Sequence, residues 1–102
     1  WWLQAETLVG FMNAFQLTGN SRYWETVKLS WNFIENHVID HERGEWYTKV
    51  NRLGVPYLTE PEDDPSPYYR NDRKIDPWKC PYHNGRAMME LISRIDNILK
   101  NI

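Results

Sequence analysis

The chain has 102 residues, of which 41% are hydrophobic, 25% charged and 15% aromatic, and its formal charge is −2. This composition is typical of a folded soluble domain and excludes disorder and collagen. No apolar run approaches the roughly 20 residues that cross a bilayer, and no signal peptide is visible. There is no basic run that would bind nucleic acid. We therefore expect neither a membrane nor a nucleic acid as partner.

Cys80 is the only cysteine. It can form neither an internal disulfide nor a cysteine-based zinc cage, and a single thiol fits a reducing compartment, so we expect a cytoplasmic protein. Its sequence neighbours offer no assured partner that would activate the thiol as a nucleophile. His37 and His41 are four residues apart but lack the H-E-x-x-H pattern, so we expect no bound metal.

Two features of the sequence are unusual for a small domain. The chain opens with Trp1 and Trp2 rather than with Met, which predicts a fragment of a longer protein. It also contains six Trp and six Tyr, more rings than a small core needs. The surplus predicts a surface that binds ring-shaped ligands.

The first 18 residues are predicted to form a helix that Gly19 ends. Apolar residues recur there at helical spacing, namely Trp1, Ala5, Leu8, Met12 and Phe15. Because further apolar residues occupy its other faces, this helix should be buried on several sides. A connection of about two residues leads to a second helix that Asn20 or Ser21 caps, so the two should form an antiparallel hairpin of an inner and an outer helix.

The second helix is amphipathic, with one apolar stripe formed by Trp24, Val27, Trp31, Ile34 and Val38. After Asp40 the periodicity changes, and residues 45–50 and 55–58 are predicted to pair as a small β-hairpin across a turn at 51–54. Residues 59–82 contain five of the six prolines and an acidic run, which predicts a long structured loop or a partly mobile flap.

Asn84 is predicted to cap a third helix. One broad apolar face of this helix contains Met88, Leu91, Ile92, Ile95, Ile98, Leu99 and Ile102. Three helices and a hairpin cannot cover a first helix that is apolar on several sides. The sequence therefore predicts neighbours that lie outside this chain.

Two clusters carry candidate chemistry. Trp2 and Glu6 share one helix face, so an indole plane lies beside a carboxylate. The indole can stack on the C–H face of a pyranose while the carboxylate accepts sugar hydroxyls. The alternative is a core Trp with a capping Glu.

His83 belongs to the second cluster and would precede a helix N-terminus, whose positive end disfavours imidazolium. A neutral imidazole can act as a base, although a purely structural histidine is the alternative. Arg86 would either hold a carboxylate or lie on the surface.

Four motifs, WWLQAE at 1–6, LTGNSRY at 17–23, GEW at 44–46 and WKCPYHNGR at 78–86, resemble the C-terminal part of the N-acylglucosamine 2-epimerase superfamily. Within it, the resemblance is strongest to the cellobiose and mannobiose 2-epimerases. It implies that residues 1–102 are a single partial domain, the C-terminal part of an all-α (α/α)6 barrel whose remainder lies upstream of Trp1. It also implies a sugar substrate and no cofactor.

The resemblance further implies epimerisation at C2 of a reducing-end sugar through an enediolate. His83 matches one of two acid/base histidines, Trp78 matches a sugar-stacking residue, and Trp2 and Glu6 match residues that hold the sugar. The second histidine and an arginine lie upstream in the family, so we expect the chain alone to be inactive. The substrate stays open among cellobiose, mannobiose, lactose, an N-acylglucosamine and a free monosaccharide.

Two other functions compete with this interpretation. A helical-barrel glycoside hydrolase would use Glu6 as its acid, but it needs a second carboxylate at a matched distance. A non-catalytic carbohydrate-binding module would use the indoles of Trp1, Trp2, Trp46 and Trp78 as stacking surfaces.

Overall fold

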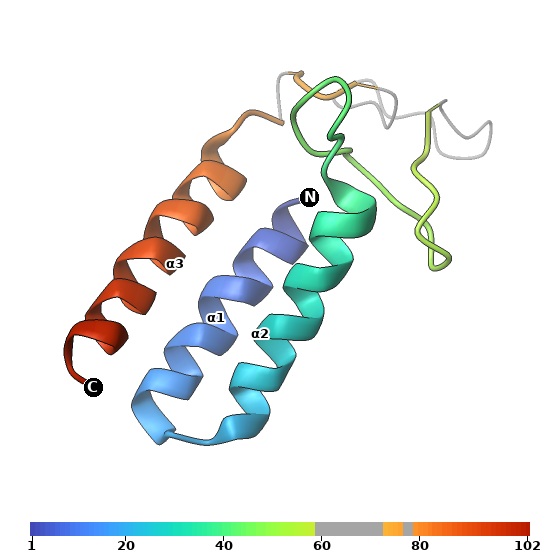
Figure 1. Cartoon of the computed structure of the whole chain (residues 1–102). Helices are drawn as coiled ribbons and strands as arrows, with labels where there is room; N and C mark the ends of the chain where they lie inside the picture. The colour runs from blue at the N-terminus through green and yellow to red at the C-terminus, as the bar shows by residue number, and fades with distance from the viewer. Residues whose placement is uncertain (59–72, 77–78) are drawn as a thin grey trace.

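The computed structural model describes residues 1–58, 73–76 and 79–102. Three helices lie side by side: α1 (Trp2–Thr18), α2 (Ser21–Phe33), which the π-helical turn η1 (Ile34–Val38) extends, and α3 (Tyr82–Lys100). Helix α1 lies between the other two, and α1 and α3 begin at the same end of the molecule (Figure 1). The predicted helical hairpin and third helix are therefore confirmed.

The turn between α1 and α2 follows the predicted chemistry. Gly19 is left-handed, with φ 68°, and its N–H donates to the Phe15 carbonyl at 2.8 Å. The Asn20 side chain accepts from the Arg22 N–H at 3.0 Å, which caps α2. Because this connection is short, α2 runs back antiparallel to α1.

The core forms where the three helices and the segment after η1 meet. Its buried apolar members are Ala5, Leu8, Met12, Val27, Ile34, Val38, Trp46, Ala87 and Leu91. Other apolar side chains of α1 and α3 remain exposed in this chain, among them Leu3, Leu17, Met89, Ile92 and Leu99. The burial of α1 on several sides is thus only partly provided by the described residues.

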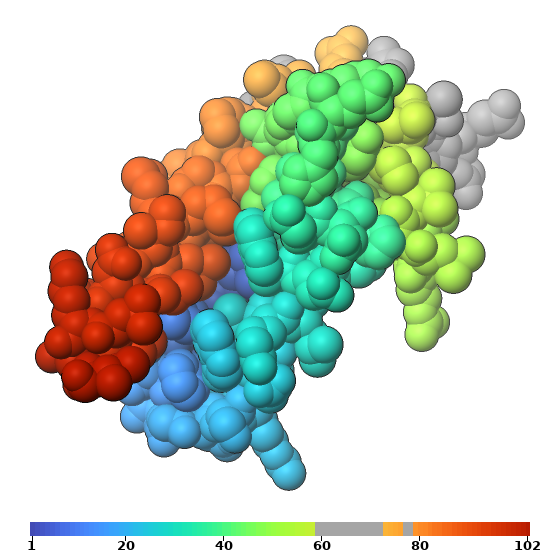
Figure 2. Space-filling view, viewed as in Figure 1, coloured from blue at the N-terminus to red at the C-terminus, as the bar shows by residue number. Residues whose placement is uncertain are grey.

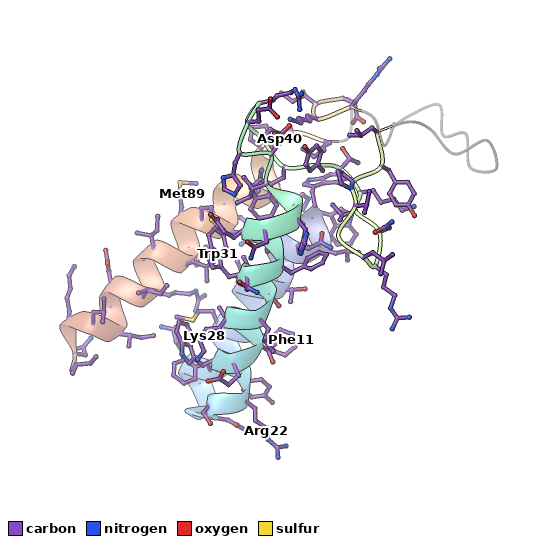
Figure 3. All side chains as sticks on the ribbon, turned by 45° about the vertical axis from the view of Figure 1, so that its right-hand side comes forward. Phe11, Arg22, Lys28, Trp31, Asp40 and Met89 are labelled. Carbon is purple, nitrogen blue, oxygen red and sulfur yellow. The ribbon has the colours of Figure 1, made fainter. Side chains whose placement is uncertain are left out.

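A groove of about 240 Å³ runs over α1 between α2 and α3. Leu8 lies at its floor, with Trp31 and Lys28 on the α2 side and Ile92 and Ile95 on the α3 side. Figure 2 shows this hollow between the cyan and the orange helix, and Figure 3 shows Trp31 and Lys28 on the side of α2 that is nearer to α3.

The predicted β-hairpin is wrong as a pair of regular strands. Among the described residues, 45–58 contain one isolated antiparallel bridge within the segment, between Val50 and Pro56. The reversal at 51–54 is present, since the Asn51 N–H donates to the Val55 carbonyl at 2.9 Å and the Tyr57 N–H donates to the Lys49 carbonyl at 2.9 Å. Val50 and Pro56 form the non-hydrogen-bonded pair between these two bonds, so the proline is accommodated without loss of a bond between the two segments.

Helix α3 begins at Tyr82 with Pro81 at the N-cap position, so the prediction that Asn84 caps it is wrong. Asn84 lies inside the first turn, where its side chain donates to Glu45 instead. Most of the Pro-rich loop predicted at 59–82, including Trp78, lies outside the described residues. None of the described helices has the length and apolar character that a membrane span requires.

Candidate active site

The candidate site lies where α1 and α3 begin. The first turns of α1 carry Trp2 and Glu6, one helical turn apart on the same face. The first turn of α3 carries His83 and, three residues later, Arg86. The two helices pack side by side and begin at the same end of the molecule (Figure 1). Their first turns therefore bring these four side chains together from opposite ends of the sequence.

Glu6 connects the two helices. Its Oε1 accepts a hydrogen bond from His83 Nδ1 at 3.0 Å, and both of its carboxylate oxygens contact Arg86 Nη2. Each of the three side chains keeps about one third of its surface exposed, namely 36% for Glu6, 34% for His83 and 33% for Arg86. The triad is therefore fixed in position but still accessible to a ligand.

The charges of this triad define its protonation pattern. The Arg86 hydrogen bond, followed by that from His83, holds the pKa of Glu6 below its ordinary value. The same contact raises the pKa of Arg86. Since an ionised carboxylate can only accept, His83 Nδ1 must be the donor and carry the proton. A neutral His83 then has its lone pair on Nε2.

Two aromatic rings flank the His83 imidazole. The Trp2 ring centroid is 5.9 Å away at an interplanar angle of 42°, and the Tyr82 ring meets it nearly edge-on at 5.0 Å and 76°. Trp2 is 44% exposed, so its indole presents a face beside the histidine. Trp2 is therefore not part of the core that the described residues form.

The structure thus brings together three of the four predicted site residues, Trp2, Glu6 and His83, whereas Trp78 lies outside the described residues. It also decides between the two alternatives for Arg86, which holds the Glu6 carboxylate. The i, i+3 spacing of His83 and Arg86 in a helix was the available signal.

A second polar cluster next to the site was missed. Its centre is Glu45, whose carboxylate accepts from Lys79 and Asn84. The sequence signal was the GEW motif at 44–46, for which spacing alone assigns no role. Within the described ranges, no three His, Cys, Asp or Glu side chains gather in a way that would hold a metal ion.

Known proteins resemble this chain in sequence and in fold. The cellobiose 2-epimerase structure from Spirochaeta thermophila superposes with a TM-score of 0.76 at 39% identity, covering 97% of this chain and 22% of that one. The cellobiose 2-epimerase of Ruminococcus albus is 42% identical over 95 residues, which are 92% of this chain and 21% of the relative. That of Dictyoglomus turgidum is 40% identical over 96 residues, 93% of this chain and 21% of the relative.

The fold class is therefore that of the (α/α)6-barrel epimerases, as the motifs predicted. Residues 1–70 match the family model described as N-acylglucosamine 2-epimerase (GlcNAc 2-epimerase). The chain belongs to this family. It spans about a fifth of the length of the relatives that it matches.

Proposed function

We propose that this chain is the C-terminal part of a carbohydrate 2-epimerase that inverts C2 of a reducing-end sugar. The observation that carries the proposal is the 3.0 Å contact between Glu6 and His83 Nδ1, which joins the two family motifs across 77 residues of sequence. The 2-epimerase names of relatives at about 40% identity support the same class of reaction. The exposed apolar faces of α1 and α3 support further barrel helices that cover them.

His83 is proposed to exchange the C2 proton. A C–H next to a carbonyl is a weak acid, so the reaction needs a positioned base whose lone pair faces the carbon. With Nδ1 donating to Glu6, the neutral ring offers Nε2 as that base. Once the sugar ring has opened to the aldehyde, removing the C2 proton gives an enediolate, and the second histidine, proposed to lie upstream, returns a proton to the opposite face of C2 to give the epimer.

Glu6 and Arg86 are proposed to keep His83 in its working tautomer. The Glu6 carboxylate orients the ring and stabilises the imidazolium that forms when Nε2 takes a proton. Arg86 keeps Glu6 ionised, because its charge favours the carboxylate over the acid. Glu6 is thus proposed to orient His83, in addition to making the sugar contact that the family resemblance implies.

Trp2 and Trp78 are proposed to stack on the sugar. The exposed Trp2 indole lies within 5.9 Å of the His83 ring, a separation that allows one pyranose to meet both groups. The second histidine and the arginine near O1 and O2 are proposed to come from the upstream part of the barrel. A peptide of residues 1–102 should therefore turn over no sugar, and measurable epimerisation by it would contradict the proposal.

The hydrolase alternative is less well supported. A general acid must be protonated at the working pH, whereas the bond from Arg86 holds the pKa of Glu6 below its ordinary value of 4.5. Among the described residues, the carboxylate of Glu45 is already bound by three donors. Glu6 is therefore poorly suited to be the general acid, and Glu45 is poorly suited to be the second carboxylate.

The test is to incubate the full-length protein with cellobiose and to separate the products. A 2-epimer, glucosyl-mannose, supports the proposal. Free glucose would instead indicate a hydrolase, and unchanged cellobiose with measurable binding would indicate a carbohydrate-binding protein. Mannobiose, lactose and N-acetylglucosamine, tested in parallel, determine which sugar the complete site prefers.

A further inference from the structure

Glu45 is the centre of a polar cluster that contacts the first turn of α3 and the segment before it. Its Oε1 accepts from Asn84 Nδ2 at 2.6 Å, from Lys79 Nζ at 3.3 Å and from the Trp46 N–H at 2.9 Å. Lys79 precedes α3 and Asn84 lies in its first turn. One carboxylate oxygen thus holds the chain on both sides of His83.

The members of this cluster are buried. Lys79 has no exposed side-chain surface, Asn84 is 6% exposed and the Glu45 side chain 20% exposed. Lys79 Nζ also donates to the Lys74 carbonyl at 2.6 Å. Burying a charged pair costs desolvation that its attraction rarely exceeds, so such a pair is weak evidence for stability and better evidence for a fixed geometry.

Glu45 lies in a tight turn whose backbone is left-handed at two successive residues. Glu45 has φ 62°, the left-handed region that a residue with a Cβ seldom adopts, and Gly44 before it has φ 84°. The turn is closed by the Gly44 N–H to the Asp40 carbonyl at 2.8 Å and by the Asp40 N–H to the Glu45 carbonyl at 2.9 Å. Figure 3 labels this loop at Asp40. With the backbone in this conformation, the Glu45 side chain reaches Asn84 of α3.

Helix α3 lacks a cap of its own. Pro81 occupies the N-cap position without a side-chain hydrogen bond, and the first turn is closed by the Gly85 N–H, which donates to the Pro81 carbonyl at 2.9 Å and to Asn84 Oδ1 at 3.1 Å. The only described side-chain carboxylate that binds Asn84 is that of Glu45. His83, the residue before Asn84, is then held on its ring by Glu6 and through its backbone neighbour by Glu45.

We propose that Glu45 is a positioning residue for His83, which places the imidazole against Glu6 by holding Asn84 and Lys79. The inference rests on the proposed acid/base role of His83. Its mode of action is geometric: without Glu45 the first turn of α3 shifts, His83 Nδ1 leaves Glu6, and the ring loses its fixed tautomer.

The test exchanges the two partners of the 2.6 Å bond in the full-length protein. In Asn84→Asp, a second carboxylate faces Glu45. In Glu45→Gln/Asn84→Asp, an amide donor again faces a carboxylate, with the direction of the bond reversed. Glu45→Ala removes the acceptor altogether, and Glu42→Gln, an exposed change in the same loop, is the control.

We expect Asn84→Asp and Glu45→Ala to lower kcat by about 10-fold or more, with KM within about 2-fold, and the exchanged pair to restore kcat to within about 3-fold. Equal kcat in Asn84→Asp and in the exchanged pair would overturn the proposal. So would a loss of thermal stability in Glu45→Ala with an unchanged kcat per folded molecule.

An activity-independent measurement separates this inference from the proposed function. Nitrogen-15 NMR of the imidazole, with the His83 signal assigned by its absence in His83→Asn, should report the Nδ1–H tautomer in the parent protein and in the exchanged pair. Asn84→Asp and Glu45→Ala should lose it. If the parent protein gives no epimer, the proposed function fails while this tautomer pattern still decides the role of Glu45. If the Nδ1–H tautomer persists in all variants, the proposed positioning role of Glu45 is wrong.

Discussion

The two ends of α1 and α3 differ in what their side chains do. Where both helices begin, Glu6 meets His83 and Arg86 through charged hydrogen bonds, and each group stays about one third exposed. Farther along the same helices, Leu8 and Leu91 are buried and line an apolar groove. The same pair of helices therefore carries a partly exposed charged cluster at one end and apolar packing along the rest.

This difference predicts that stability and turnover depend on different parts of the two helices. Apolar burial holds the helices in register, and the register brings Glu6 within 3.0 Å of His83. Glu6, His83 and Arg86 each keep about one third of their side-chain surface exposed, so their substitutions should affect turnover more than stability. Substitutions along the groove should do the reverse.

The largest expected effect is on stability, from Leu8→Ala in the full-length protein. Leu8 has no exposed surface, and removing such a side chain leaves a cavity that costs about 2–5 kcal/mol of unfolding free energy. Urea denaturation measures this loss, and kcat per folded molecule should be unchanged. Leu53→Ala, at a position 85% exposed, is the control and should change stability by about 0.5 kcal/mol or less.

His83→Asn should produce the largest effect on turnover. Asn keeps the size and polarity of the side chain but cannot exchange a proton, so kcat should fall by at least about 10²-fold while sugar binding and folding persist. The same substitution at the exposed His41 is the control and should leave kcat unaltered. A near-normal rate in His83→Asn would favour the structural-histidine alternative.

Glu6→Gln should have a smaller effect on turnover, about 10-fold, because Gln can still orient the ring but cannot stabilise imidazolium. It should also change the response to acid. The pKa of Glu6 is lowered in the fold, so its charge stabilises the protein above its ordinary value of 4.5, and this contribution disappears as the pH falls through the lowered value.

Melting temperatures of parent and Glu6→Gln proteins should therefore differ at pH 7 and converge below pH 4.5. The Glu25 carboxylate, in an exposed pair with Lys28 at 2.8 Å, supplies the control Glu25→Gln, which should show little difference at either pH. A difference in melting temperature that is larger below pH 4.5 than at pH 7 would contradict the lowered pKa of Glu6.

The smallest effect on stability is expected for Trp2→Ala and Trp78→Ala. Both indoles are proposed to bind sugar, so KM should rise while the free energy of unfolding changes by about 1 kcal/mol or less. Trp46→Ala, at an indole only 6% exposed, is the contrast and should destabilise the protein by about 3–5 kcal/mol. Normal kinetics with a large loss of stability would place Trp2 or Trp78 in the core.

The sequence predicted the helices well because their signals are local. Apolar periodicity, Gly19 and the Asn20 cap specify the α1–α2 hairpin without information from elsewhere in the chain. The predicted strands were wrong because residues 45–58 make only the isolated bridge between Val50 and Pro56, and Glu45 adopts a left-handed conformation that no propensity suggests.

The candidate site was only partly predictable for the same reason. Trp2, Glu6 and His83 carry motif signals, but the spacing does not show that Glu6 binds His83 across 77 residues. Asn84 has the sequence signal of a helix cap, and only the approach of Glu45 explains its different role. Long-range contacts between charged groups depend on the packed register of the helices, which local patterns do not contain.

The most direct test of the central claim, that His83 exchanges the C2 proton, is the isotope content of C2 after incubation in D₂O. Full-length protein and its His83→Asn variant are incubated with cellobiose, and deuterium at C2 of the reducing-end sugar is measured by NMR. The account predicts deuterium at C2 of the product formed by the parent protein and none from the variant. Labelling by His83→Asn at the rate of the parent protein would contradict it.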